Sequence, residues 1–232
     1  MKYRHEYKYL CNAVENTTIK ARVKGILKED SHTKSKGFYT VRSLYFDTWD
    51  NSFYYDNING VDQRDKYRIR IYDSDPSRIL LEKKSKHNFK TLKSSCKITP
   101  QICNSLIYGM HITLNKSMDP LAIRLISEMQ FRKLRPVVIV EYTRYPFVEK
   151  IGNIRITFDE NIRTSNDIHN FLDKTIHTRP ILAKGNSVLE IKWDEIFPEF
   201  IKNHIQIETL RWTNFSKYAL CRYYNYYGGI KL

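Results

Sequence analysis

The strand-like segments of this chain alternate charged and apolar residues, so each has one charged face and one apolar face. In residues 66–72, KYRIRIY, an extended strand puts Lys66, Arg68 and Arg70 on one side and the apolar and aromatic residues on the other. The same register recurs in residues 5–9, 80–84, 154–159 and 189–193. One such strand fits a sheet with a solvated face. Repeated along the chain, the pattern also fits antiparallel strands closed into a barrel with a polar lumen, and a lumen rich in cations needs a polyanion.

Length and charge limit the possibilities. With 232 residues and 41% hydrophobic content, the chain is most simply one folded domain, residues 1–232. Its 39 Lys and Arg against 25 Asp and Glu give a net charge of +14. That charge predicts an anionic partner, which could be nucleic acid, a phospholipid surface or a phosphorylated small molecule.

The cysteines and the hydropathy of the chain indicate the cellular compartment in which the protein is expected. The four cysteines form no CxxC pair and the seven histidines no cluster with ligand spacing, so neither a disulfide scaffold nor a zinc site is indicated. The longest aliphatic run, 137–140, is too short to span a bilayer, and the N-terminus has no apolar export segment. We therefore expect a cytoplasmic protein with no membrane segment.

The local patterns predict many strands with helices between them. Expected strands are 4–11, 38–47, 52–58, 65–72, 78–86, 91–98, 135–146, 153–160 and 187–193. Expected helices are 17–28, 100–108, 120–131, a short one after residue 193, and 214–226. Turn residues mark 57–60 and 73–77 as loops. The predicted fold is α+β, mostly antiparallel β, with a closed eight-stranded tunnel barrel whose lumen is polar, decorated by helices.

Eight short motifs follow one another: RHEYKYL at 4–10, SLYFD at 43–47, YRIR at 67–70, LEKK at 81–84, EYTR at 141–144, RITFD at 155–159, LEIK at 189–192 and FSKY at 215–218. In this order they resemble the VTC (vacuolar transporter chaperone) domain, the polyphosphate polymerase branch of the triphosphate tunnel metalloenzymes. Each motif alone is common by chance. Eight in order, over nearly the whole chain, are specific.

The resemblance implies a set of catalytic cations that bind phosphate: Lys8, Arg68, Arg70, Lys84, Lys97, Arg144, Arg155 and Lys217. It also implies substrate-binding roles for Tyr142, Ser216, Lys192, Glu82 and Glu6. For Glu6 and Glu82 a salt bridge to a tunnel cation is the alternative. Glu190 is the implied ligand of a divalent metal, Mn²⁺ or Mg²⁺.

Strand parity supports this set independently of the resemblance. Residues two apart share one face of a strand, and three pairs of the implied residues are spaced in this way. They are Arg68 with Arg70, Glu82 with Lys84, and Tyr142 with Arg144. Arginine forks match phosphate oxygens bidentately, so such faces suit a phosphate chain.

The first motif departs from the pattern of the hydrolytic relatives. Triphosphatases and adenylyl cyclases of this group usually begin Glu-x-Glu-x-Lys, whereas here Arg4 stands first and only Glu6 and Lys8 remain. Fewer carboxylates favour holding a phosphate chain over activating water. Lys86, Lys90 and Lys93 are expected in a solvated loop, where they could also draw ATP inward.

The predicted function is a metal-dependent polyphosphate polymerase that transfers the γ-phosphate of ATP to a growing polyphosphate chain and releases ADP, with triphosphate, pyrophosphate or phosphate as primer or ligand. Two alternatives remain. One is a tunnel-fold inorganic or nucleoside triphosphatase, and the other is a non-catalytic protein that binds a polyanion or nucleic acid. A nucleic-acid partner is not expected, because no helix-turn-helix, zinc-finger or RNP-like motif is found.

Overall fold

The computed structural model describes residues 5–87, 90–206 and 210–228, and it divides into two compact units. The first unit comprises Met1–Thr40, Tyr142–Arg163 and Pro180–Lys217. The second comprises Val41–Glu141, Thr164–Arg179 and Tyr218–Leu232. Arg4, the first residue of the RHEYKYL motif, lies outside the described residues.

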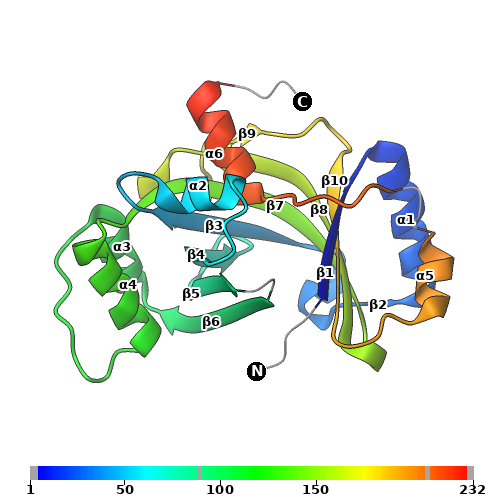
Figure 1. Ribbon diagram of the computed structural model, residues 1–232, viewed down its shortest axis with the longest axis horizontal. Helices are drawn as coiled ribbons and strands as arrows, with labels where there is room; N and C mark the ends of the chain where they lie inside the picture. The colour runs from blue at the N-terminus through cyan, green and yellow to red at the C-terminus, as the bar shows by residue number, and fades with distance from the viewer. Residues whose placement is uncertain (1–4, 88–89, 207–209, 229–232) are drawn as a thin grey trace. The chain divides into compact units, whose positions relative to one another are not determined.

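The first unit is a set of antiparallel strands with helices packed on one face. Its strands are β1 (His5–Cys11), β2 (Lys28–Glu29), β10 (Ser187–Trp193) and parts of β7 (Arg135–Glu149), β8 (Ile154–Ser165) and β9 (Arg179–Pro180). Its helices are α1 (Ala13–Ile26), α5 (Glu199–Ile205) and the 3-10 turns η1 (Ser31–Lys36) and η2 (Ile151–Asn153). Figure 1 shows α1 and α5 beside each other, next to β1 and β10. Their core joins Ile19 and Val23 of α1 and Ile201 of α5 to the apolar strand residues.

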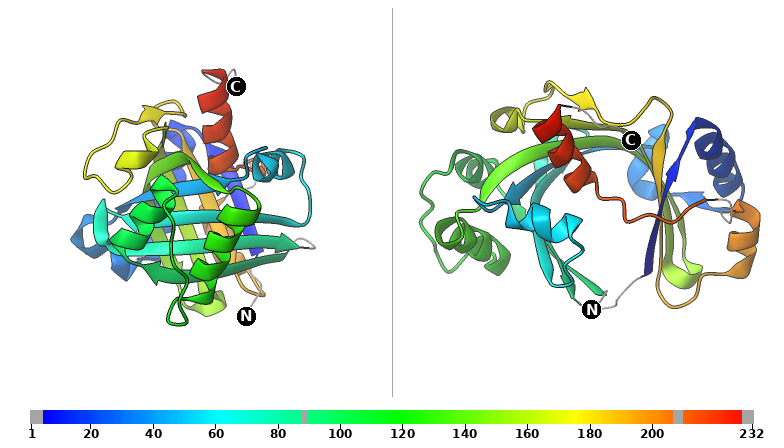
Figure 2. Two further views of the ribbon diagram at one scale, coloured as in Figure 1. Left: turned by 90° about the vertical axis from the view of Figure 1, so that its left-hand side faces the viewer. Right: turned by 45° about the horizontal axis from the view of Figure 1, so that its top comes forward.

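The second unit is an antiparallel meander covered by two helices. Its strands are most of β3 (Tyr39–Asp47), β4 (Arg64–Tyr72), β5 (Asp75–His87), β6 (Lys90–Ile98) and the first part of β7. Its helices are α2 (Ser52–Ile58), α3 (Pro100–Tyr108), α4 (Pro120–Phe131), α6 (Lys217–Tyr227) and the 3-10 turn η3 (Ile168–Asn170). The left view of Figure 2 shows α3 and α4 lying over the strands of the meander. Leu106 of α3 and Leu125 of α4 are buried against the apolar strand face.

Strand register separates charged from apolar residues as the alternation predicts. Tyr45 lies opposite Arg68, and Arg68 lies opposite Glu82. One residue along, Ile69 and Leu81 are opposite each other and fully buried in the core beneath α3 and α4. The charged row and the apolar row therefore occupy opposite faces of the same strands.

Capping residues account for most of the helix boundaries. The helices predicted at 100–108 and 120–131 are confirmed, and their N-cap side chains, Thr99 and Asp119, accept backbone hydrogen bonds. The helix predicted at 17–28 begins earlier, at residue 13. Asn12 and Glu15 form a capping box there, in which each side chain binds the other residue's backbone N–H.

The strand predicted at 52–58 is wrong, because this segment is helix α2. Phe53 and Tyr54 are strand-forming residue types, but the preceding residues cap a helix. The Asp47 carboxylate accepts hydrogen bonds from the N–H groups of Phe53 (2.9 Å) and Tyr54 (3.2 Å). The Tyr218 hydroxyl also binds Asp47, so one buried carboxylate anchors the starts of both α2 and α6.

The expected loops are present only in part. Residues 57 and 58 belong to α2, and residues 75–77 belong to β5. Asp73 and Ser74, both with positive φ, make the tight turn between β4 and β5. None of the helices in the described part of the chain is long and apolar enough to cross a membrane.

The mostly antiparallel α+β fold is confirmed, but the sheet is not closed by hydrogen bonds. The strand order is β1-β10-β8-β7-β3-β4-β5-β6, with β2 paired to β7 and β9 to β8. Among the described residues no ladder joins β1 to β6, so the expected closed barrel is corrected to an open strand order. The free edge of β1 is occupied instead by the segment before α6: Tyr9 bridges Trp212, and Thr213 N–H donates to the Lys8 carbonyl.

Candidate functional site

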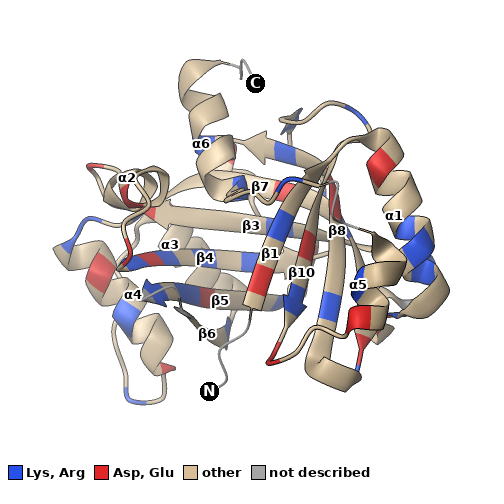
Figure 3. Ribbon diagram, turned by 45° about the vertical axis from the view of Figure 1, so that its right-hand side comes forward, with Lys and Arg blue, Asp and Glu red and all other residues tan. Residues whose placement is uncertain are grey.

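In the first unit, two glutamates and two lysines occupy neighbouring positions of the ladder between β1 and β10. Lys8 lies opposite Glu190, and Glu6 lies opposite Lys192. The Glu190 carboxylate is 3.0 Å from Lys192 Nζ and 3.7 Å from Lys8 Nζ, and Lys8 Nζ is 3.2 Å from Glu6. Figure 3 shows this alternation of acidic and basic positions on the two strands. The quartet is balanced in charge.

Glu190 is the most enclosed member of this quartet, with a side chain only 8% exposed. Burial alone would raise the pKa of a carboxyl, but the charges of Lys192 and Lys8 outweigh it and hold the pKa of Glu190 well below its usual range. Glu190 is therefore ionised at neutral pH, as a metal ligand must be.

A second carboxylate, Asp159, holds two more of the predicted cations. Its two oxygens accept hydrogen bonds from Arg144 Nε (2.7 Å) and Nη2 (2.8 Å), and Lys217 Nζ lies 2.6 Å away. Arg144 and Lys217 also lie over the Tyr142 ring. Burial alone would raise the pKa of Asp159, but the charges of Arg144 and Lys217 lower it below the ordinary value. A guanidinium, an ammonium and a phenol are thus gathered around one buried anion.

The remaining predicted residues of this unit lie near the two clusters. Lys8 Nζ donates to the Phe215 carbonyl at 3.3 Å, which ties β1 to the segment that carries Ser216. Arg155 lies opposite Lys192 on β8 and is bound by Asp30.

In the second unit, Glu82 gathers three cations. Its side chain is 2% exposed and lies 2.6 Å from Arg68 Nε and 3.6 Å from Arg70 Nη1, and it also pairs with Lys93. Burial raises the pKa of a carboxyl, but Arg68, Arg70 and Lys93 together push that of Glu82 far below its ordinary value. Three cations therefore meet at one buried carboxylate.

Neutral hydroxyls orient the two arginines of this Glu82 cluster. Arg68 Nη1 donates to the Tyr45 hydroxyl and Arg70 Nε donates to Ser43 Oγ, each at 3.1 Å. Both acceptors come from β3, the strand next to β4. Two guanidinium groups are therefore fixed in direction without further negative charge, which suits them to bind phosphate oxygens.

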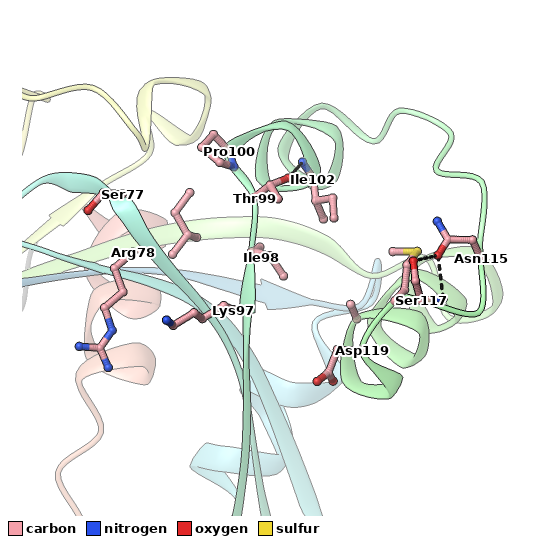
Figure 4. A pocket seen from close by; sticks show the side chains of 13 residues that line it. Ser77, Arg78, Lys97, Ile98, Thr99, Pro100, Ile102, Asn115, Ser117 and Asp119 are labelled. Carbon is pink, nitrogen blue, oxygen red and sulfur yellow. Dashed lines mark hydrogen bonds between the residues drawn. The ribbon is translucent and has the colours of Figure 1, made fainter.

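Lys84 and Lys97 are the other two predicted cations of this unit. Lys84 lies on β5 opposite Lys66 and Lys93. Lys97 is exposed and lies opposite Leu80, at the edge of a pocket of about 460 Å³ that is also lined by Arg78. Figure 4 shows Lys97 and Arg78 on the same side of the β5–β6 hairpin, away from Asp119.

Sequence reasoning missed several residues of these clusters. Asp159 ends the RITFD motif but received no role, and Asp30 lies in no motif. Lys86 and Lys93 lie on β5 and β6, as the predicted strands 78–86 and 91–98 imply, and not in a solvated loop, and Lys93 pairs with Glu82. The alternation Lys93-Ser94-Ser95-Cys96 was the available signal, since it puts Lys93 on the face opposite buried Cys96.

The donor set limits how a metal could bind. No group of three or more His, Cys, Asp or Glu side chains suitable for a metal occurs among the described residues. Glu190 offers one ionised carboxylate, with Glu6 close by across Lys8. This arrangement fits a Mg²⁺-like ion, which needs only one or two protein carboxylates when substrate phosphates supply other ligands.

Comparison with known proteins places the chain in a family. The VTC domain family matches residues 3–224, so this chain belongs to the VTC domain family. A putative adenylyl cyclase from Hippeastrum, described as having a dominant triphosphatase activity, has a similar fold, with a TM-score of 0.57 and 14% identity over 99% of this chain and 97% of that one. A putative adenylate cyclase from Bacillus halodurans aligns with a TM-score of 0.50 and 16% identity over 88% and 87% of the two chains. No curated protein sequence matches.

The Glu82 cluster predicts an acid-sensitive contribution to stability. Because the folded-state pKa of Glu82 lies below its usual value of about 4.3, its ion pairs stabilise the fold above that pH, and the stabilisation is lost as the pH falls towards the folded pKa. Glu82→Gln should lower the free energy of unfolding by about 3–5 kcal/mol at pH 7, because it removes the charge of a buried carboxylate that three cations share.

Urea unfolding of both proteins at pH 7, 5, 4 and 3 measures this effect. The difference between wild type and Glu82→Gln should shrink below about pH 4.3. Glu195→Gln, at an exposed position with no ion pair to the described residues, is the matched control and should stay within about 0.5 kcal/mol of wild type. A difference for Glu82→Gln that is the same at pH 7 and pH 3 would contradict the assignment.

Proposed function

We propose that this protein is a metal-dependent polyphosphate polymerase that transfers the γ-phosphate of ATP to the end of a growing polyphosphate chain and releases ADP. Membership of the VTC domain family supports this function. The observation that carries it is the Glu82 cluster, in which Arg68, Arg70 and Lys93 share one carboxylate. Three cations gathered at one carboxylate form a group that a polyanion can bind.

Phosphoryl transfer requires mainly that the protein align the reacting groups and neutralise their charge, so no nucleophilic triad is needed. Residues of the first unit form a second group that would bind phosphate. Arg144 and Lys217 would bind phosphate oxygens beside Tyr142, and Lys8 with Lys192 would turn from Glu190 towards the substrate. Glu190 would hold Mn²⁺ or Mg²⁺, which would supply positive charge to the phosphate groups of the substrate.

The metal has a physical role in this proposal, because Glu6 and Glu190 bring two negative charges to the strand face on which Lys8 and Lys192 lie. A bound cation would offset these charges and favour binding of a polyanion. The roles of Arg155, Lys84, Lys97 and Ser216 in substrate binding are part of the same proposal. So are the single-domain organisation and the cytoplasmic location.

A triphosphatase is the second candidate. The Hippeastrum protein with the similar fold is described as having a dominant triphosphatase activity. Against this, the first motif here retains only Glu6 of the two glutamates expected in hydrolytic relatives. Fewer free carboxylates favour phosphate-chain binding over activation of water.

The reaction product separates the two candidates. Purified protein incubated with ATP and Mn²⁺ or Mg²⁺ should yield ADP and polyphosphate, resolved by ³¹P NMR and gel electrophoresis, and EDTA should abolish turnover. Orthophosphate as the sole phosphorus product besides ADP would assign a hydrolase. Turnover that survives EDTA would remove the metal from the proposal, and a steeply salt-dependent affinity for RNA without turnover would favour a binding protein.

The proposed metal ligand can be tested separately. Glu190→Gln should keep the fold and lower turnover by about 100-fold, because loss of a metal ligand displaces the bound phosphates. Glu195→Gln, two positions past the end of the same strand and exposed, should keep wild-type turnover. Equal losses in both variants, or wild-type turnover in Glu190→Gln, would show that the metal is bound elsewhere.

A further inference from the structure

Asp30 is a buried carboxylate that belongs to none of the recognised motifs. It follows β2 and is 5% exposed. Its Oδ1 accepts hydrogen bonds from the backbone N–H of His32 at 2.9 Å and lies 2.7 Å from His32 Nδ1. Its Oδ2 lies 2.8 Å from Arg155 Nη1. One oxygen therefore holds the turn η1, and the other holds a predicted phosphate-binding arginine.

Hydrogen bonds of its own backbone hold Asp30 in place independently of Arg155. Asp30 N–H donates to the Pro146 carbonyl of β7 at 3.1 Å, and the Asp30 carbonyl accepts from the N–H and hydroxyl of Thr33. Burial alone would raise the pKa of Asp30, but the hydrogen bonds from His32 and the charge of Arg155 lower it below its usual value. The carboxylate is thus an ionised, immobile partner.

Arg155 is held from a second direction by a neutral group. Arg155 Nη2 donates to the buried Tyr39 hydroxyl at 3.1 Å. Both terminal nitrogens of the guanidinium are thereby fixed, while the side chain stays 31% exposed. Arg155 also lies opposite Lys192, on the charged face of the strands that carry Glu190 and Glu6. A partly exposed guanidinium whose direction is fixed on that face can bind an anion without reorienting.

We infer that Asp30, assisted by Tyr39, is a positioning residue that aims the Arg155 guanidinium at a phosphate group of the substrate. The inference rests on the proposed function only in taking a phosphate chain as the ligand. Asp30 has two opposing effects on Arg155: it orients the guanidinium, and it offsets the positive charge that attracts an anion. A purely electrostatic role predicts that removing the Asp30 charge strengthens anion binding, whereas a positioning role predicts that it weakens binding.

The test is a double-mutant cycle read by calorimetric binding of inorganic triphosphate. Asp30→Asn should weaken binding about tenfold in the wild-type background and have no effect in the Arg155→Ala background, because the aimed group is then gone. Tyr39→Phe, which removes only a hydroxyl, should weaken binding less and should likewise depend on Arg155. Glu29→Gln removes a neighbouring charge that pairs with Lys24 rather than Arg155, and it should leave binding unchanged or slightly stronger.

Melting temperatures of all variants separate positioning from folding. Should Asp30→Asn fail to fold, Tyr39→Phe carries the cycle. Stronger binding by Asp30→Asn, or an equal loss with and without Arg155, would overturn the inference, and so would a wild-type protein that does not bind triphosphate. A protein that binds triphosphate with the expected coupling but makes no polyphosphate would refute the proposed polymerase and leave the role of Asp30 standing.

Discussion

The charged strand faces of this protein depend on buried carboxylates that each hold one or more cations. Asp159 binds Arg144 and Lys217, Glu82 binds Arg68, Arg70 and Lys93, and Asp30 binds Arg155. Without these anions, half-buried guanidinium and ammonium groups would repel one another and lose hydration, at a cost of several kcal/mol each. The carboxylates make a folded protein with such faces possible in the absence of ligand.

The same pairing prepares the cations for a ligand. A guanidinium held by Asp159 or Asp30 keeps its direction, so little conformational entropy is lost when a phosphate group binds to it. Neutral partners extend this effect: Tyr45 and Tyr39 orient arginines without reducing their charge. Cations that are oriented in advance are what the proposed transfer of a phosphoryl group would require.

Sequence reasoning predicted the features that depend on neighbours along the chain. Alternation placed Arg68 and Arg70 on the charged face because side-chain direction in a strand is a local property, and Thr99 and Asp119 marked two helix starts. It could not predict which carboxylate meets which cation, since Asp30 reaches Arg155 only through the packing of distant segments. It also misassigned residues 52–58, where capping by Asp47 outweighs the strand preference of Phe53 and Tyr54.

The central claim is that these cations are arranged for a phosphate chain and are not merely a charged surface. The melting temperature of the apo protein with inorganic triphosphate, compared with sulfate at equal ionic strength, tests it directly. At 100 times its dissociation constant, triphosphate should stabilise the fold by about 2.7 kcal/mol and raise the midpoint by about 5–10 °C. The combined change Arg68→Ala and Arg70→Ala should reduce that rise. An equal response to triphosphate and sulfate would indicate general screening of surface charge and would contradict the account.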